Sequence, residues 1–303
     1  MAKREAPRST PSTPANHQRG ASLAELTGRL SLKRQEIIRP VMESPREFVL
    51  MSVRGLAKRL KTDPATTVRI VRAMGFSGHR DFQRFLHELS IAQATSLDWM
   101  RASAAHEASI PARIRATLEQ ESRNLQALRN TLDYKRIEAL TRRIYAASKI
   151  LIIGGDMATS LVNYFEYHLV MLGFTVLAAT TPGRTAHISR YVGSGDVVFA
   201  MSFGRGLRLT IEGLQQAHAR GAYCVGLTDT FVSPIARFAD EVFIASVETP
   251  SFGSSYVAPL ALLNVFHVAC ANYRRRRTFR LLKEAEGEQR FGFRWYEPEK
   301  TVQ

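Results

Sequence analysis

Five short apolar runs in the second half of the chain limit most strongly what it can fold into. They lie at residues 149–155, 174–179, 196–202, 222–228 and 241–246, and amphipathic stretches with helical spacing separate them. Runs that are apolar at nearly every position are typical of strands buried on both faces of a parallel sheet. Because the crossovers between such strands are right-handed, the sequence predicts a three-layer α/β domain with a five-stranded parallel sheet.

The segment "MSFGRGLRLT", residues 201–210, follows the third of these runs and precedes a helical stretch. Ligands bind open α/β folds at the carboxyl ends of the strands. The glycines of this segment therefore mark the expected ligand site.

The first half of the chain contains a helix pair joined by a three-residue turn, in "SVRGLAKRLKTDPATTVRIVRAMGF" at residues 52–76. Asp63 suits the N-cap of the second helix and Pro64 its first position. Thr66, Thr67 and Arg69 are expected to face outward, and their hydroxyl and guanidinium groups suit base edges and phosphates in a major groove. The pattern favours a helix-turn-helix DNA-binding domain over an ordinary helix pair.

The spacing of apolar residues and the local composition predict how the chain divides into domains. The first residues are rich in Pro, Ser, Thr and Arg, which is typical of disorder. The expected parts are a disordered basic tail at 1–20, an all-α helix-turn-helix domain at 21–95, a helical linker at 96–130, the α/β domain at 131–278 and a C-terminal tail at 279–303.

The formal net charge of +15 is concentrated at the two ends of the chain. Residues 1–92 carry roughly +9 and residues 271–303 roughly +4, whereas the segments 93–130 and 131–270 each carry roughly +1. A basic end domain beside a neutral middle points to a polyanionic partner, most often nucleic acid. A solvated basic surface is the alternative, and a nucleoid-type binder that uses charge without a sensor is a third interpretation.

Composition excludes several other classes of protein. No uninterrupted apolar run reaches the length of a membrane span, and the N-terminus has no apolar core of a secretory signal, so we expect no membrane partner and a cytoplasmic protein. Cys224 and Cys270 lie far apart in apolar segments, which favours buried reduced thiols over a disulfide or a metal site. We expect no cofactor and no metal.

The helix pair resembles the N-terminal helix-turn-helix of the RpiR-type bacterial transcriptional regulators. Together with the second half of the chain, the resemblance to this family covers about residues 25–275. The matching residues are Ser52, Leu56, Ala57, Ala65, Thr66, Arg69, Gly75, Phe76 and Gly78. The resemblance implies that Thr66, Thr67 and Arg69 lie nearest the bases. Lys58, Arg72 and Arg80 are expected nearer the phosphates.

The second half resembles the sugar isomerase (SIS) domain that this family carries as its sensor. The residues in the expected places are Asp196, Ser202, Gly221, Thr228, Asp229, Ser233 and Asp240. In the family two loops at the strand ends hold a phosphosugar through hydroxyls and backbone amides. The resemblance implies a transcriptional regulator that binds a double-stranded operator as a homodimer or homotetramer.

Both loops depart from the family pattern. The first keeps Gly154 but has Asp156 at a glycine position, and the second keeps Ser202 but has Gly204 and Arg205 where a serine and a glycine are usual. Hydroxyl donors are thus missing, and guanidinium groups are suited to replace them. The expected effector is a small anionic metabolite, such as a sugar phosphate, and its ligand set is Gly154, Asp156, Ser202, Gly204, Arg205, Arg208 and Ser254.

Three alternatives remain at this stage. Arg205 and Arg208 are ordinary surface residues if the pocket is degenerate, and Ser254 or Ser255 is equally suited to cap the last helix. A phosphosugar isomerase would need a base, for which Glu248 and His187 are available, although each is more typical of a surface residue. We therefore expect no catalytic residues. The basic run 274–277 is best explained by the dipole at a helix C-terminus.

Overall fold

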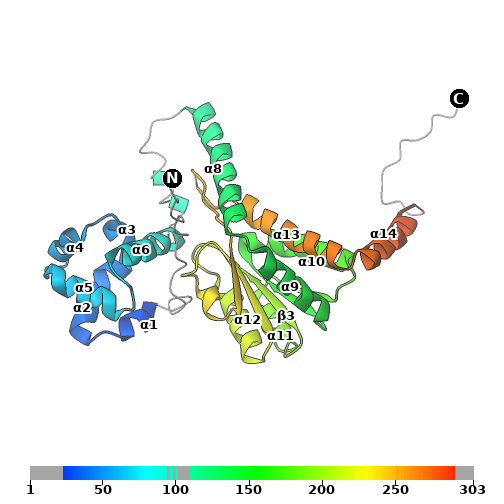
Figure 1. Cartoon of the computed structure of the whole chain (residues 1–303), viewed down its shortest axis with the longest axis horizontal. Coiled ribbons are helices and arrows are strands. Elements are labelled where there is room, and N and C mark those ends of the chain that lie inside the picture. Colours follow the sequence, from blue (N-terminus) through cyan, green and yellow to red (C-terminus); the bar gives the residue numbers. More distant parts are fainter. Residues whose placement is uncertain (1–22, 94–95, 98–99, 102–108, 251, 291–303) are drawn as a thin grey trace, which may run out of the picture.

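The computed structural model describes residues 23–93, 96–97, 100–101, 109–250 and 252–290. Figure 1 shows an all-α domain at one end and an α/β domain beside it, with the long helix α8 (Ile110–Thr131) rising from the α/β domain. The helices of the first domain are α1 (Leu23–Gly28), α2 (Leu32–Glu43), α3 (Pro45–Phe48), α4 (Val53–Arg59), α5 (Pro64–Ala73) and α6 (His79–Gln93). The expected basic tail at 1–20 lies outside the described residues.

Helices α4 and α5 form the predicted helix pair, and side chains start both of them. The Ser52 hydroxyl accepts a hydrogen bond from the Gly55 N–H at 3.2 Å, and the Asp63 carboxylate accepts one from the Thr66 N–H at 2.8 Å. These bonds satisfy amide groups that a helix N-terminus otherwise leaves without a partner. Hydrogen bonds from the side chain and the backbone of Thr66 also lower the pKa of Asp63. The start of α5 is therefore fixed by the Asp63–Pro64 pair, as the sequence predicts.

A left-handed residue ends each of these two helices. Gly75 has φ = 101° after α5, and the Phe76 N–H returns to the Val71 carbonyl oxygen at 3.2 Å. Lys61 takes the same role after α4 with φ = 52°, where a side chain is strained. Backbone conformation thus ends both helices. After α5, the aromatic ring of Phe76 packs into the core of the helical domain.

The second domain contains the predicted five-stranded sheet. Its strands are β1 (Ile150–Ile153), β2 (Val176–Ala179), β3 (Val197–Met201), β4 (Tyr223–Thr228) and β5 (Glu241–Ile244). They pair in the order β2-β1-β3-β4-β5, and every pairing is parallel. All positions of β1 and β3 are buried, which explains why these runs are apolar throughout.

Helices cover both faces of this sheet, which gives the three predicted layers. One core joins the sheet to α8, α9 (Tyr134–Ala146), α10 (Thr159–Met171) and α13 (Val257–Tyr273). The other joins it to α11 (Pro182–Ile188), α12 (Arg208–Ala219) and the 3₁₀ turn η2 (Pro234–Arg237). A short 3₁₀ turn, η1 (Asp156–Ala158), precedes α10. The predicted fold class is confirmed.

The basic run 274–277 begins at the C-terminus of α13, where Arg274 is the C-cap, as the dipole explanation expects, but it continues into another helix. Helix α13 ends at Tyr273, and a further helix, α14 (Arg275–Arg290), begins within the run and continues past the domain boundary predicted at residue 278. The Arg277 guanidinium instead donates to the Gly173 carbonyl oxygen at 2.8 Å, just beyond the end of α10. It also lies 5.3 Å from the ring centre of Phe174. Arg277 therefore stabilises the end of another helix.

None of the helices built from the described residues has the length and apolar character needed to cross a bilayer.

Substitution of Gly213 tests the close packing of α12, the helix that follows the glycine-rich loop. A Cβ at this position would lie 2.5 Å from Thr185 Cγ2 and 3.1 Å from Ile153 Cδ1. Thr185 is buried and β-branched, so it has little freedom to move away. We expect Gly213→Ala to lower the free energy of unfolding by about 1–3 kcal/mol, despite the higher helix propensity of alanine.

Urea denaturation followed by circular dichroism measures this change. Gly183→Ala on α11 is the matched control, because a Cβ there meets no atom within 4 Å. The control is expected to be as stable as the parent chain or slightly more so. Equal stability of Gly213→Ala and the parent would contradict the packing described for α12.

Candidate ligand site and nucleic-acid interface

The carboxyl ends of β1 and β3 lie side by side at the point where the strand order reverses. From β1 the chain crosses to β2 on one side, whereas the next strand, β3, pairs with β1 on the other. In doubly wound sheets a crevice opens at this place and receives the ligand. The loops after β1 and β3, which contain most of the predicted ligand residues, meet at this edge.

Two glycines follow β1 because neighbouring groups leave no room for a side chain. A Cβ on Gly154 would lie 2.8 Å from Val162 Cγ2 and 3.2 Å from the Met201 carbonyl oxygen. Asp156 comes next and is exposed with φ = 55°, a conformation that costs an aspartate little compared with most residues. Its exposed carboxylate therefore lies at the edge of the sheet where β1 ends.

The loop after β3 is held by its own polar groups. Ser202 is buried, and its hydroxyl oxygen accepts a hydrogen bond from the Leu207 N–H at 2.8 Å. Gly204 and Gly206 have φ values of 68° and 72°, so both use conformations that favour glycine. The Ser202 hydroxyl thus shapes the loop, and it keeps one O–H for a ligand.

Leucine side chains fill the part of the crevice next to Gly155. A Cβ on Gly155 would lie 2.6 Å from Leu207 Cδ2 and 2.9 Å from Leu209 Cδ2. Leu207 stands where the family resemblance expects a hydroxyl residue. The crevice is therefore more apolar near β1 than that resemblance implies.

Asp229, directly after β4, is a site residue that the sequence did not single out for ligand binding. Its Oδ1 accepts hydrogen bonds from the Gly204 N–H at 3.0 Å and from the Thr228 hydroxyl at 3.2 Å. Its Oδ2 is buried and has no partner in the described part of the chain. Burial raises the pKa of this carboxyl group. An acceptor atom is therefore available beside the glycine-rich loop.

Two aromatic rings stand beside these carboxylates. The rings of Phe203 and Tyr256 have their centres 5.2 Å apart. Burial, followed by the charges of Asp156 and Asp229, raises the pKa of Tyr256 to about 12. Tyr256 therefore remains a neutral hydroxyl donor at physiological pH. Its place directly before α13, beyond all five strands, gave no sign in the sequence of this contact.

The two candidate arginines differ in their surroundings. Arg205 is exposed in the loop between Gly204 and Gly206, and it forms no ion pair with the described residues. Arg208 is the first residue of α12, and its guanidinium pairs with Glu212 at 2.7 Å, one turn further along. The two arginines do not share a helix face, because α12 begins only at Arg208. Arg205 is the better placed of the two to meet a ligand.

The remaining candidates are two serines ahead of α13 and the two residues considered as an acid or base. Ser254 is half-buried ahead of α13, whereas Ser255 accepts a hydrogen bond from the Val257 N–H at 3.3 Å. Glu248 follows β5 and accepts a hydrogen bond from the Gln120 side chain at 3.2 Å, and exposed His187 lies on α11, which follows β2. Strands β5 and β2 are the two edges of the sheet, about 19 Å apart at the usual strand spacing. Glu248 and His187 therefore do not form an acid–base pair.

The candidate nucleic-acid interface lies on α5 and beside it. Arg69 is exposed, and its Nη2 donates to the Thr66 hydroxyl at 3.4 Å. The cations predicted nearer the phosphates are all exposed: Lys58, Arg72 and Arg80. These side chains give the front of α5 a basic, hydrogen-bonding surface.

The expectation that Thr67 contacts a base is wrong. Thr67 is only 1 % exposed, and its hydroxyl donates to the Asp63 carbonyl oxygen at 3.1 Å within the helix. It packs toward α4, together with Ile70 and Val71. A helix turns about 100° per residue, so Thr66 and Thr67 face different sides.

A cavity of about 400 Å³ separates the two domains at the carboxyl ends of β4 and β5. Its walls include Glu88 on α6, Arg123 on α8 and the pair Asp229 and Thr230 after β4. The Thr230 hydroxyl donates to Glu88 Oε2 at 3.2 Å, and Val232 packs against the core of the helical domain. Residues 229–232 therefore bond to the glycine-rich loop through Asp229 and contact the helical domain through Thr230 and Val232.

Comparison with known proteins agrees with this architecture. A SIS domain model matches residues 143–269. An uncharacterized HTH-type transcriptional regulator of Haemophilus influenzae is 26% identical over 227 residues, which is 73% of this chain and 77% of the relative. One from Caldanaerobacter subterraneus is 24% identical over 255 residues, 82% of this chain and 87% of the relative.

Two solved structures share the fold. The sugar isomerase domain of an RpiR transcription factor from Sphaerobacter thermophilus is 26% identical, with a TM-score of 0.54 over 56% of this chain and 96% of that one. The Vibrio vulnificus NanR protein, complexed with ManNAc-6P, is 21% identical, with a TM-score of 0.57 over 88% of this chain and 99% of that one. These matches agree with the resemblance found in the sequence: residues 143–269 form a SIS domain, and the relatives that match most of the chain are HTH-type transcriptional regulators.

Proposed function

We propose that this regulator binds a specific DNA operator through α5 and changes its affinity for that operator when its SIS domain binds a small anionic metabolite derived from a carbohydrate. The observation that carries the proposal is the exposed front of α5, where Arg69 and Thr66 lie together on a helix whose start is fixed by Asp63. Such a protein acts in the cytoplasm, where its DNA lies.

The DNA contacts follow from exposure and chemistry. Arg69 and Thr66 reach base edges when α5 enters the major groove, since a guanidinium group pairs well with guanine and a hydroxyl group pairs with any base. Lys58, Arg72 and Arg80 neutralise flanking phosphates, which makes binding steeply dependent on salt. Thr67 takes no part, because it is buried.

The proposed effector combines an anionic group with sugar hydroxyls. Arg205 is the exposed cation on the loop after β3, and it supplies charge-assisted hydrogen bonds to a phosphate or carboxylate. The unpartnered Asp229 Oδ2 accepts from a hydroxyl group, and the neutral Tyr256 hydroxyl donates to one. Sensing of a sugar phosphate is also the chemistry suggested by the NanR complex with ManNAc-6P.

A phosphosugar isomerase is the alternative function, and the geometry supports it less well. Isomerisation needs an acid or base near the sugar carbons. Glu248 and His187 lie beyond opposite edges of the sheet, and Glu248 is engaged by Gln120. A sensor needs only different affinities in two conformations, and the site described above is sufficient for that.

We propose that Asp229 and Thr230 couple effector binding to the DNA-binding domain. The Asp229 carboxylate accepts a hydrogen bond from the Gly204 N–H of the loop after β3. The hydroxyl of the next residue, Thr230, donates a hydrogen bond to Glu88 of α6. A ligand that moves the loop after β3 therefore moves the contact with α6 as well.

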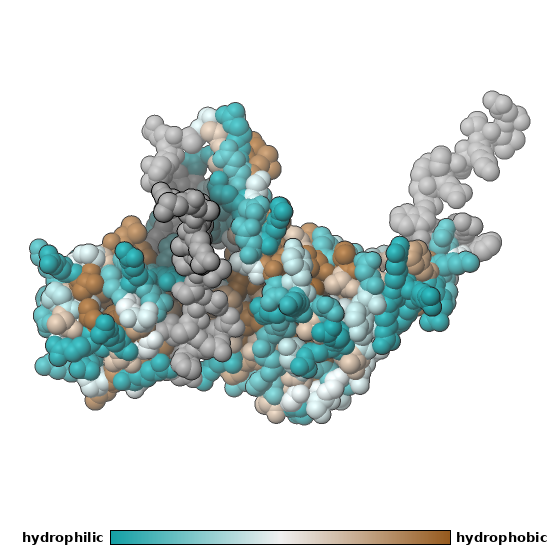
Figure 2. All heavy atoms as spheres, in the orientation of Figure 1, coloured by the Kyte–Doolittle hydropathy of each residue, from teal (hydrophilic) through white to brown (hydrophobic). Residues whose placement is uncertain are grey.

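The proposed assembly is a homodimer or homotetramer formed through the α/β domains. Figure 2 shows hydrophobic residues on α8 and in the region of α13. Large apolar side chains exposed on these helices include Ile114, Leu118, Tyr167, Val170, Met171 and Val268. Large apolar side chains exposed on neighbouring helices are typical of an oligomer contact. A two-fold dimer would present two copies of α5 to half-sites about 34 Å apart, or a multiple of that spacing.

Replacement of Arg69 tests the DNA interface. We expect Arg69→Ala to weaken binding to the preferred operator about 10- to 100-fold and to relax specificity at one base position, because a bidentate base contact is lost. Lys58→Ala is expected to weaken binding to all sequences similarly and to reduce the slope of log affinity against log salt by about 1. Fluorescence anisotropy with labelled duplexes at several salt concentrations measures both effects.

Arg220→Ala, an exposed position at the end of α12, is the matched control for the loss of a positive charge. It should leave operator affinity unchanged. If Arg69→Ala and Arg220→Ala behave alike, α5 is not the helix that reads DNA.

Replacement of Arg205 tests the effector site. Thermal-shift measurements with sugar phosphates, including ManNAc-6P, and with the corresponding unphosphorylated sugars identify a stabilising ligand. We expect Arg205→Ala to weaken the affinity for that ligand about 10- to 100-fold, since a hydrogen bond to a charged group contributes roughly 1.5–3 kcal/mol.

Arg208→Ala serves as the control, because that guanidinium is already paired with Glu212. Unchanged ligand affinity in Arg205→Ala would show that the anion is held elsewhere. It would leave the assignment of the DNA interface untouched.

A further inference from the structure

A second cavity opens at the opposite end of the sheet from the sensor loops. It has a volume of about 330 Å³ and lies where β3 and β4 begin. His218 and Asp240 line it together with Arg143, Asp196 and Tyr223. None of the proposed DNA or effector contacts lies at this edge.

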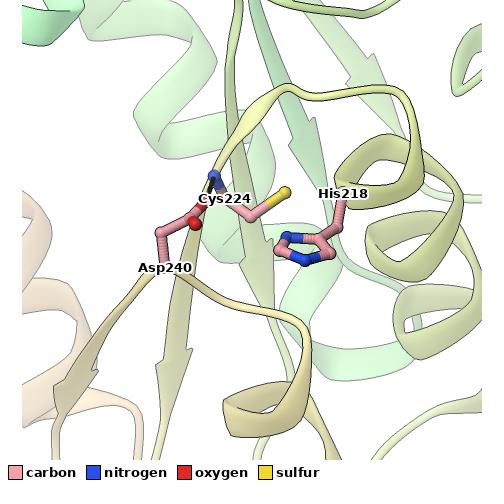
Figure 3. A group of neighbouring side chains, drawn as sticks. All are labelled: His218, Cys224 and Asp240. Atoms are coloured by element: carbon pink, nitrogen blue, oxygen red, sulfur yellow. Dashed lines mark hydrogen bonds between the residues drawn. The ribbon is translucent and has the colours of Figure 1, made fainter.

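Three side chains with different metal-binding atoms meet beside this cavity. His218 lies in the last turn of α12, Cys224 is on β4, and Asp240 directly precedes β5. One donor atom from each residue lies within 4.8 Å of the other two. In Figure 3 the Cys224 sulfur and the His218 ring point toward the same space, with the Asp240 side chain on the other side of Cys224.

The backbone holds Asp240 close to Cys224. The Cys224 N–H donates to Asp240 Oδ2 at 2.7 Å, and the Asp240 N–H donates to the Cys224 carbonyl oxygen at 2.8 Å. A carboxylate has a second oxygen, so this pair of bonds orients the group and still leaves an oxygen that can bind a cation. Metal-binding carboxylates are commonly oriented by hydrogen bonds in this way.

The Cys224 thiol has only weak partners of its own. Its sulfur lies 3.5 Å from the Ala222 carbonyl oxygen and 4.0 Å from that of Leu214. Burial and the charge of Asp240 raise the pKa of this thiol to about 12, so it is protonated at neutral pH. A bound metal ion favours the thiolate form instead, because the sulfur binds the ion and the thiol proton is released to solvent.

We propose that His218, Cys224 and Asp240 form a binding site for a borderline-soft divalent metal ion, with Zn²⁺ as the best match. An imidazole, a thiolate and a carboxylate are ligands that Zn²⁺ accepts together, and water from the cavity completes a tetrahedron. Two of these ligands are anionic once the thiol proton is lost, so the bound site is electrically neutral.

The three donor atoms must move closer together to bind one ion. Ligand atoms around a tetrahedral Zn²⁺ ion lie roughly 3.3–3.8 Å apart at the usual bond lengths. The donor atoms here lie within 4.8 Å, and the exposed His218 ring has freedom to rotate toward the buried sulfur. Nearby charges already have partners: Asp196 pairs with Lys149 at 3.4 Å, and the Arg143 guanidinium lies 4.0 Å from the ring centre of Tyr223.

Metal binding would connect α12 to β4 and β5. The other end of α12 begins directly after the sensor loop, so an ion at His218 stabilises the helix that positions this loop. This inference does not depend on the proposed function, because metal binding is measured without DNA or effector.

Cobalt substitution tests the proposal on the full chain without a polyhistidine tag. We expect one Co²⁺ per chain to give thiolate-to-metal charge-transfer absorption, and Zn²⁺ to displace it. Affinity should increase with pH, because binding releases the thiol proton. Cys224→Ala should abolish the charge-transfer absorption, and His218→Gln, at an exposed position, should weaken metal binding at least ~10-fold.

Cys270→Ala is the matched control, since Cys270 is also buried with a pKa of about 12 but does not belong to the His218–Cys224–Asp240 cluster. It should retain the full absorption and the Zn²⁺ affinity of the parent. Absence of thiolate absorption in the parent chain, or its persistence in Cys224→Ala, would overturn the assignment. So would equal metal affinity of His218→Gln and the parent.

Discussion

The Asp229 carboxylate makes the contact on which the sensor end of this molecule depends. It lies directly after β4 and holds the backbone of the glycine-rich loop that follows β3. The next residue bonds to Glu88 in the DNA-binding domain. Because a buried carboxylate with one unused oxygen is costly, this position favours a ligand that supplies a donor. The shape of the loop, the proposed ligand site and the contact between the domains therefore meet at two consecutive residues.

The chemistry of the sensor edge differs from the serine-based loops that the family resemblance implies. Leu207 and Leu209 close the space beside Gly155, and the Ser202 hydroxyl already accepts a bond from its own loop. What remains for a ligand is one arginine, the Ser202 O–H, two carboxylates and a pair of aromatic rings. This set suits a sugar-like molecule with a single anionic group better than it suits a free phosphate, because the carboxylates need hydroxyl donors.

The fold was predictable because its signals are local. Strands β1 and β3 are buried at every position and β4 at all but its first, so their apolar runs stand out in the sequence. The Asp63–Pro64 pair marks the start of α5 without reference to the rest of the chain. The domain types followed from these two features. The break between α13 and α14 has no comparable signal, because both flanks of Arg274 have helical composition.

The sites were predictable only in part, because they depend on contacts between distant segments. Asp156, Ser202 and Arg205 were found from their place after strands, whereas Asp229 and Tyr256 join them only through strand order and the packing of α13. The burial of Thr67 depends on which face of α5 meets α4. The cluster of His218, Cys224 and Asp240 comes from three elements that meet at one edge of the sheet, so spacing in the sequence did not reveal it.

The central claim is that α5 reads a specific DNA sequence. Selection of tight-binding duplexes from a random library by the full chain at moderate salt tests it most directly. We expect one DNA sequence, arranged as two related half-sites, to be enriched over successive rounds of selection. This sequence should also outcompete random DNA in direct binding. Equal binding of selected and random duplexes, with affinity set by salt alone, would contradict it.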